Sequence, residues 1–163
     1  MGDLPNSDSK RELFRHTLAT LAYRGGKAIR NAPEEFAEFR AGEGSRAAGQ
    51  ILAHIGDLLA WAYSLAAEEE AWSNAKPQPW DNESQRFFAL LKKLDDYLAS
   101  AQPVHVPLER LFQGPVADAF THVGQIGMLR RLAGSPVKGE NYSVAGINVG
   151  SVGSQQQPPQ REF

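Results

Sequence analysis

The chain has 163 residues and a formal net charge of -2, which is enough for one domain with a hydrophobic core and gives no sign of a nucleic-acid-binding surface. It contains no cysteine, so disulfides, thiolate metal ligands and a cysteine nucleophile are excluded. No apolar run has the length of a membrane span, and the N-terminal residues lack the apolar core of a signal peptide, which predicts a cytoplasmic protein.

Two helices are expected in the N-terminal half of the chain. Apolar residues recur at helical spacing between residues 13 and 29, and Asn31-Ala-Pro33 is typical of a helix end. Residues 32–44 are rich in glutamate and contain two glycines, which predicts a solvated connection. A second helix is expected from Ser45 to about Trp72, with one apolar stripe that is formed by Ile51, Ile55, Leu58, Ala62 and Leu65.

Two further helices are expected in the C-terminal half. After the prolines of residues 76–80, Asp81 or Asn82 is suited to cap a third helix. A fourth is expected from Gly114-Pro115 to Gly134, where a glycine followed by a proline ends it. Four helices without strands predict an all-α fold, an antiparallel four-helix bundle over residues 1–134. Residues 135–163, rich in glycine, glutamine and proline, are expected to form an irregular tail, in which residues 155–160 are expected to be extended and poorly ordered.

Polar side chains lie on the predicted inner face of the fourth helix. At about 100° per residue, Asp118, His122 and Gln125 share one stripe with Leu129 and Leu132. Asp118 and His122 are four residues apart, so their Cβ atoms lie about 5–6 Å from each other, which suits the binding of one metal ion. A carboxylate on a buried stripe needs compensation, and a metal ion, a charged His122 and an arginine are the three candidates.

The second helix offers a third ligand. His54 lies at the margin of its apolar stripe, so we expect it to face the interior and to meet the fourth helix. Together with Asp118 and His122 it would leave coordination positions of a metal ion open, as in catalytic sites. Asp57, one turn after His54, is expected to lie further toward the outside. The alternative is structural: a hydrogen-bonded core histidine beside a local ion pair.

Other features of the fourth helix have structural interpretations. Arg130 and Arg131 lie near its C-terminal end, where cations interact favourably with the helix dipole. Gly124 and Gly127 lie on the side opposite to Asp118, and such small residues would allow close approach by another helix or by a second subunit. This side of the helix therefore indicates a surface for a homodimer.

Two segments resemble the DinB-like superfamily, a group of small bacterial four-helix bundles related to the bacillithiol transferases and the mycothiol-dependent maleylpyruvate isomerases. They are AGQILAHIGDLLAW at residues 48–61 and DAFTHVGQ at residues 118–125, and the resemblance extends over residues 10–134. That family holds a divalent metal through one histidine on the second helix and two on the fourth, four residues apart. His54 and His122 match this pattern by position, whereas Asp118 stands where the family has histidine.

The resemblance implies a metal-dependent hydrolase or a thiol-dependent transferase that acts on a small molecule. A bound zinc or nickel ion, or in second place manganese or iron, would activate water or a low-molecular-weight thiol. Gln125 would orient a ligand or donate a hydrogen bond next to the metal, and Asp57 is the nearest candidate for a general base. From another class, the alternative is a non-catalytic bundle whose polar stripe is structural or belongs to a binding surface or dimer interface.

Overall fold

In a computed structural model of the chain, residues 7–69, 74 and 76–163 are described, and within these ranges the regular structure is helical, apart from a single β-bridge between Glu140 and Glu162. The predicted all-α class is confirmed for this part of the chain. The four long helices are α1 (Ser7–Ile29), α2 (Ala48–Ala67), α3 (Trp80–Ala99) and α5 (Ala117–Leu132).

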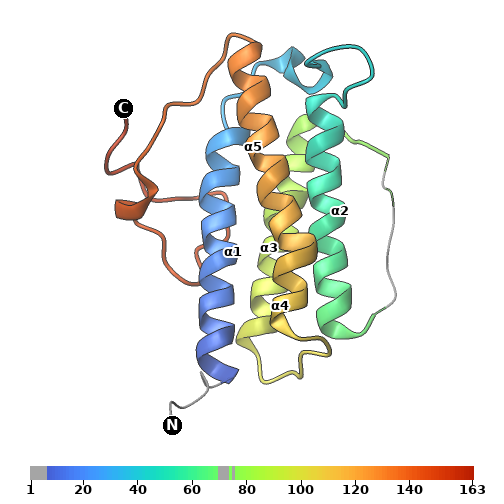
Figure 1. Cartoon of the computed structure of the whole chain (residues 1–163), viewed down its shortest axis with the longest axis vertical. Coiled ribbons are helices and arrows are strands. Elements are labelled where there is room, and N and C mark those ends of the chain that lie inside the picture. The colour runs from blue at the N-terminus through green and yellow to red at the C-terminus, as the bar shows by residue number, and fades with distance from the viewer. Residues whose placement is uncertain (1–6, 70–73, 75) are drawn as a thin grey trace.

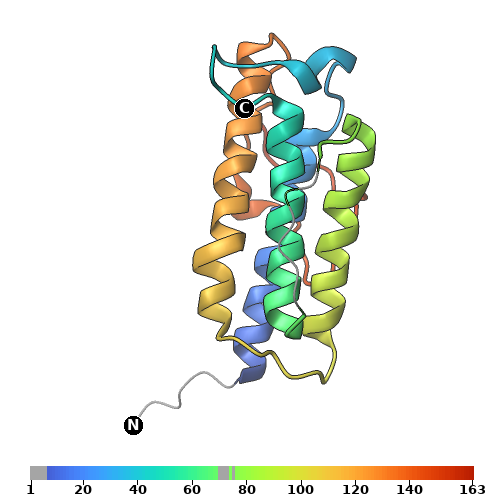
Figure 2. The ribbon, with the colours of Figure 1, turned by 90° about the vertical axis from the view of Figure 1, so that its right-hand side faces the viewer.

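The long helices lie side by side along the long axis of the molecule (Figure 1, Figure 2). α1 and α5 run in one direction and α2 and α3 in the other, so α2 and α3 start at the same end and are parallel. α1 packs against α3 and α5, and α2 also packs against α3 and α5. The helices that carry the predicted metal ligands, α2 and α5, are therefore direct neighbours.

The ends of α2 and α3 differ from those expected. α2 begins at Ala48 rather than at Ser45, and the backbone N–H of Ala47 donates to Gln50 Oε1 at 2.8 Å. It ends at Ala67, because the next residue has a left-handed backbone with φ 57°; Trp72, the expected end, lies outside the described residues. α3 starts at Trp80, directly after Pro79, so neither of the expected capping residues precedes it.

Short helical turns connect the long helices. The connection before α2 contains the 3-10 helix η1 (Glu34–Glu38), and the connection after α3 contains the short helix α4 (Leu108–Leu111). α4 continues through a π-helical segment, η2 (Phe112–Val116), into α5. Gly114 in η2 has non-helical dihedral angles, and Pro115 cannot donate a backbone hydrogen bond. Gly114-Pro115 is therefore a kink between two helical stretches and not the first turn of an isolated helix.

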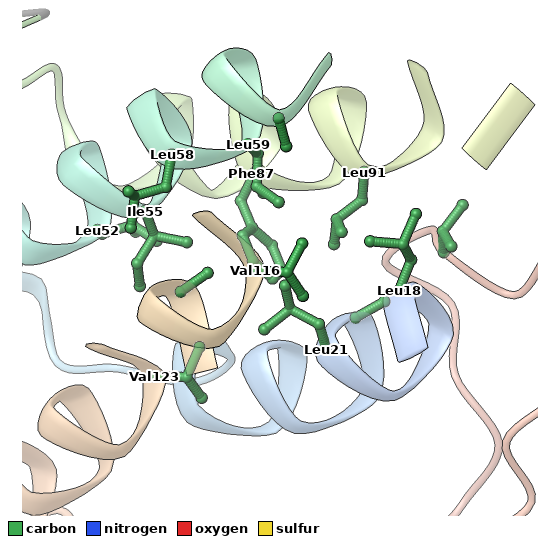
Figure 3. Packing of buried hydrophobic residues seen from close by; sticks show 14 of the residues in the cluster. Leu18, Leu21, Leu52, Ile55, Leu58, Leu59, Phe87, Leu91, Val116 and Val123 are labelled. Carbon is green, nitrogen blue, oxygen red and sulfur yellow. The ribbon is translucent and has the colours of Figure 1, made fainter. Parts of the chain in front are cut away.

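The hydrophobic core fills the space between the four long helices (Figure 3). Leu18 from α1, Leu59 from α2 and Phe87 from α3 are all fully buried in it. α1 and α3 come especially close at Gly25, where an added Cβ would lie 2.5 Å from Phe87 Cζ. Among the described helices, none combines the length and the apolar character that crossing a membrane would require.

Residues 135–163 are irregular, as predicted, apart from the 3-10 helix η3 (Tyr142–Val144). Much of this segment packs along α1 (Figure 1), whereas residues 155–160, which were expected to be poorly ordered, are mostly exposed. Glu140 is buried and accepts hydrogen bonds from Tyr23 Oη at 2.6 Å and from Lys27 Nζ at 2.7 Å. Val152 joins the hydrophobic core. Ion pairs and apolar contacts, which a composition rich in glycine and glutamine does not reveal, hold the segment in place.

Candidate metal centre

His54, Asp118 and His122 converge where α2 meets α5. His54 Nε2 lies 3.7 Å from Asp118 Oδ2, and His122 Nε2 lies 3.4 Å from Asp118 Oδ1. One donor atom from each of the three residues lies within 4.8 Å of the other two. The two imidazole rings meet edge to face with their centroids 4.7 Å apart. The side chain of a distant helix thus joins a pair on α5, as the sequence predicted.

These separations fit a single divalent ion. Donor atoms that each lie about 2.0–2.2 Å from one ion are roughly 3–4 Å from one another. Both distances between carboxylate and imidazole fall in this range, and the three atoms as a group need only a small inward movement of a side chain. Two imidazole nitrogens and one carboxylate oxygen are a donor set that zinc, nickel, manganese and iron all accept.

Gln125 fixes the orientation of the His122 ring. His122 Nδ1 lies 2.8 Å from Gln125 Oε1, so the Nδ1–H group donates to the amide oxygen. The other nitrogen, Nε2, then faces the Asp118 carboxylate, which can only accept hydrogen bonds when ionised. A lone pair that faces a carboxylate requires a cation between the two groups or a second proton on the ring. Gln125 is therefore an acceptor beside the candidate centre, a role typical of residues that orient metal-binding histidines.

The centre is open to solvent on the side of Asp118. The His122 side chain is 12% exposed, whereas that of Asp118 is 48% exposed. The expectation that Asp118 is buried is therefore wrong, and its half-exposed carboxylate keeps much of its hydration. Leu132, expected on the same buried stripe, is also exposed at its end of α5. What distinguishes the three residues is their geometry and not the cost of burying Asp118.

Electrostatics favours a neutral His54. Burial, followed by the influence of His122 and of the Arg46 cation, lowers the pKa of the His54 imidazole from its usual value. The neutral ring is the form that offers a nitrogen lone pair to a metal ion. Among the described residues no arginine forms an ion pair with Asp118, so of its three expected partners a metal ion and a charged His122 remain.

A hollow of about 360 Å³ opens beside His122 and Gln125. Most of its other lining is apolar and comes from Ile51, Met128, Leu129 and Leu132, and the cation of Arg46 also lines it. Sequence analysis missed Arg46 because it lies in the connection before α2, where no periodicity indicates the direction of a side chain. The hollow gives a small molecule room next to the candidate metal centre.

Asp57 does not lie toward the outside of the molecule, and that prediction is wrong. It is buried, and its carboxylate pairs with Arg86 of α3. Arg86 also contacts Glu83 and the backbone carbonyl of Ala53. α2 packs against α3 as well as α5, so a residue turned away from α5 is buried against α3. The ion pair with Arg86 gives Asp57 a structural role, and its geometry lends no support to a role as general base.

Comparison with known proteins identifies no relative: no family model, curated protein or solved structure matches the chain significantly. The resemblance to the DinB-like superfamily accordingly depends on the two segments around His54 and His122. The candidate centre itself depends on the convergence of His54, Asp118 and His122 between α2 and α5.

Proposed function

We propose that the chain is a metal-binding protein of the DinB-like type, a four-helix bundle in which α1 and α5 run opposite to α2 and α3, and that His54, Asp118 and His122 hold one divalent cation. The observation that carries the proposal is the approach of three donor atoms from two helices to within 4.8 Å of one another. The contact between His122 and Gln125 supports it, since it presents Nε2 to the centre. The opposed directions of the helix pairs α1/α5 and α2/α3 agree with a bundle.

The chemistry that fits this arrangement is hydrolysis or thiol transfer on a small molecule. A bound divalent ion with three protein ligands would lower the pKa of water or of a low-molecular-weight thiol, so that the nucleophile forms near neutral pH. His54 and Asp118 come from different helices, so they hold the donor set together only while α2 and α5 stay packed. The half-exposed side of Asp118 admits the nucleophile, and the hollow beside His122 receives an apolar part of the substrate.

The donor set favours zinc or nickel, with manganese and iron in second place. Imidazole nitrogen suits zinc, nickel and iron, and a single carboxylate adds one negative charge without excluding any of them. Compared with three histidines, the set with Asp118 is more negative by one charge. A divalent cation bound to the set with Asp118 should therefore depend less on a further anionic ligand than one bound to three histidines.

A non-catalytic protein is the second candidate. In this case His122 carries a second proton and forms an ion pair with Asp118 over 3.4 Å. The exposure of Asp118 favours this alternative, because a solvated His–Asp pair at a spacing of four residues is common on helices. The two candidates differ in one measurable property, the stoichiometric binding of a divalent metal.

Metal content and affinity test the proposal. The chain is purified without nickel resin and analysed by elemental mass spectrometry, and zinc is then titrated calorimetrically into EDTA-treated protein. Loss of an outer-shell partner alone costs about 10–100-fold in affinity, so His54→Ala and His122→Ala should each cost at least about 100-fold. The matched control is His16→Ala, an exposed residue of α1, which should leave the affinity unchanged.

Asp118→Asn separates the charge of the carboxylate from its shape. The metal proposal predicts weaker zinc binding by this variant, whereas an ion pair with charged His122 predicts no zinc binding by any form of the chain. Absence of stoichiometric metal from the wild type, or an unchanged affinity in His54→Ala, would rule out the proposed centre. With a metal-loaded chain, a screen of thiol-transfer and hydrolase substrates then identifies the reaction.

A further inference from the structure

A second hollow, of about 380 Å³, lies between α1, α5 and the C-terminal segment. On α5 it is lined by Phe120, Gly124, Gly127 and Arg131, which occupy the opposite face of the helix from Asp118 and His122. The C-terminal segment that runs beside α1 in Figure 1 supplies another part of its wall, including Lys138 and Tyr142. The hollow thus lies on the other side of α5 from the candidate metal ligands, although Met128 lines both this hollow and the one beside His122.

Two glycines create this space. A Cβ added to Gly124 or Gly127 would meet nothing within 4 Å. The sequence predicted that these small residues let another helix or a second subunit approach. Within the described residues of one chain, no side chain fills the position above them.

The lining of the hollow is strongly cationic. It includes Arg24, Lys27, Arg131 and Lys138. The two lysines are already matched by carboxylates of the C-terminal segment. Lys27 Nζ lies 2.7 Å from Glu140 and 3.0 Å from Glu162, and Lys138 Nζ lies 3.6 Å from Glu162.

The two arginines are not matched in this way. Among the described residues no carboxylate pairs with Arg24 or Arg131. The guanidinium carbon of Arg24 lies 4.2 Å from the centroid of the Tyr142 ring, which positions it beside the hollow without neutralising it. Two guanidinium groups therefore border one small hollow with their charge uncompensated.

The charge and the lining together indicate the class of ligand. A phosphate monoester carries about two negative charges at neutral pH, which matches two unpaired guanidinium groups, whereas a carboxylate carries one. Guanidinium groups also bind phosphate oxygens through paired N–H donors. Phe120, Val123 and Met128 supply an apolar wall next to the cations. A ligand that uses the whole hollow therefore combines a phosphate with an apolar group.

We propose that this hollow binds a small phosphate ester, whose phosphate contacts Arg24 and Arg131 and whose apolar group packs over Gly124 and Gly127 against Phe120. The site is independent of the candidate metal centre, since it uses a different face of α5 and none of its proposed ligands. The phosphate ester would cover the face of α5 that carries Gly124 and Gly127, and the positive charge of the hollow would attract it.

The test is a titration of the isotope-labelled full-length chain with phenyl phosphate, followed by NMR at the backbone amides of Gly124 and Gly127. Inorganic phosphate and phenol serve as probes of the two halves of the ligand. We expect saturable shifts with phenyl phosphate and weaker binding of either half. Arg24→Gln and Arg131→Gln should each weaken the binding of phenyl phosphate by about tenfold or more.

Two further variants complete the design. Arg110→Gln makes the same charge change at an exposed position of α4 and should leave the affinity unchanged. Gly127→Leu should fold, because its Cβ meets nothing and leucine favours a helix, and its side chain should fill the hollow and abolish binding. In that variant the amide of Gly124 remains as the reporter.

Three results would overturn the proposal. The first is the absence of saturable shifts, and the second is equal affinity of Arg131→Gln, Gly127→Leu and Arg110→Gln for phenyl phosphate. The third is binding that disappears when divalent metal is removed with EDTA, because the anion would then sit at the candidate metal centre. Equal affinity for phosphate and phenyl phosphate would overturn the assignment of an apolar part to the ligand.

Discussion

Arg130 joins the end of α5 to the end of α1, and its guanidinium group is the best single target for a stability measurement. The residue is buried, and all five of its N–H groups donate hydrogen bonds. Three of the acceptors are backbone carbonyls at the end of α1, and the other two belong to one serine. The acceptors are Ala28 O, Arg30 O, Asn31 O, Ser135 O and Ser135 Oγ, at 2.9–3.2 Å.

Arg130→Met keeps an unbranched apolar stem and removes the guanidinium group, with its hydrogen bonds and its charge. A buried acceptor left without its partner costs about 1–3 kcal/mol. Three carbonyls of α1 lose their partner together, and water restores some of the lost hydrogen bonds because they lie at the end of the helix. We therefore expect the variant to lose about 3–5 kcal/mol of unfolding free energy, a large share of the roughly 5–15 kcal/mol of a typical domain.

Urea unfolding followed by circular dichroism measures this loss, and the adjacent residue provides the control. Arg131 has the same side chain but is exposed, so Arg131→Met should change the unfolding free energy by no more than about 0.5 kcal/mol. A loss below about 1 kcal/mol for Arg130→Met, or equal losses for the two variants, would refute the interpretation that Arg130 caps α1.

Two further predictions concern α1 and the C-terminal segment. Gly25→Ala should destabilise the chain by about 1–3 kcal/mol, because the new Cβ would lie 2.5 Å from Phe87 Cζ, whereas Gly127→Ala should stabilise it by about 0.5–1 kcal/mol. Urea unfolding of the pair checks both signs, and a Gly25→Ala variant as stable as the wild type would contradict the close approach. The hydrogen bond from Lys27 lowers the pKa of Glu162, so the stabilisation is complete above its ordinary value of 4.5 and is lost as the pH falls through the lower folded value. The stability difference between the wild type and Glu162→Gln should therefore shrink between about pH 6 and pH 3, and a constant difference would contradict the assigned ion pair.

The long helices were predictable because their apolar residues recur at helical spacing. The ends of the helices were less predictable, because they depend on backbone conformation. Glu68 adopts a left-handed conformation that ends α2, and nothing in its side chain indicates this. The continuation from α4 through Gly114 and Pro115 into α5 was likewise missed, since a proline after a glycine is as typical of a helix start as of a kink.

The candidate site shows what periodicity can and cannot establish. The spacing of Asp118 and His122 fixes their common face, and the margin position of His54 correctly turns it toward α5. The position of Asp57 was predicted wrongly because a helical wheel centred on one apolar stripe accounts for only one neighbouring helix. α2 is buried against two helices, α3 and α5. The buried partner of Asp57 is Arg86, 29 residues away on α3, and no local pattern relates the two.

Contacts between distant segments explain the remaining differences. Arg130 was expected to interact with the dipole of its own helix, and its guanidinium in fact binds carbonyls of α1, because α1 and α5 run in the same direction and end together. Glu140 also pairs with distant residues, since its partners Tyr23 and Lys27 lie more than a hundred residues earlier in the chain. Such pairs join distant parts of the chain, and composition alone cannot predict them.

The two proposed sites lie on different faces of α5 and bind ligands of opposite charge. The face of α5 toward α2 presents Asp118 and His122, which attract a cation, and the face toward α1 presents Gly127 and Arg131, which leave room and charge for an anion. Both sites need a second element, α2 for the cation and α1 for the anion, so both depend on the rotation and register of α5. Arg130 lies between these faces and anchors the end of the helix to α1. Its burial is thus a structural requirement of both sites, although its side chain belongs to neither.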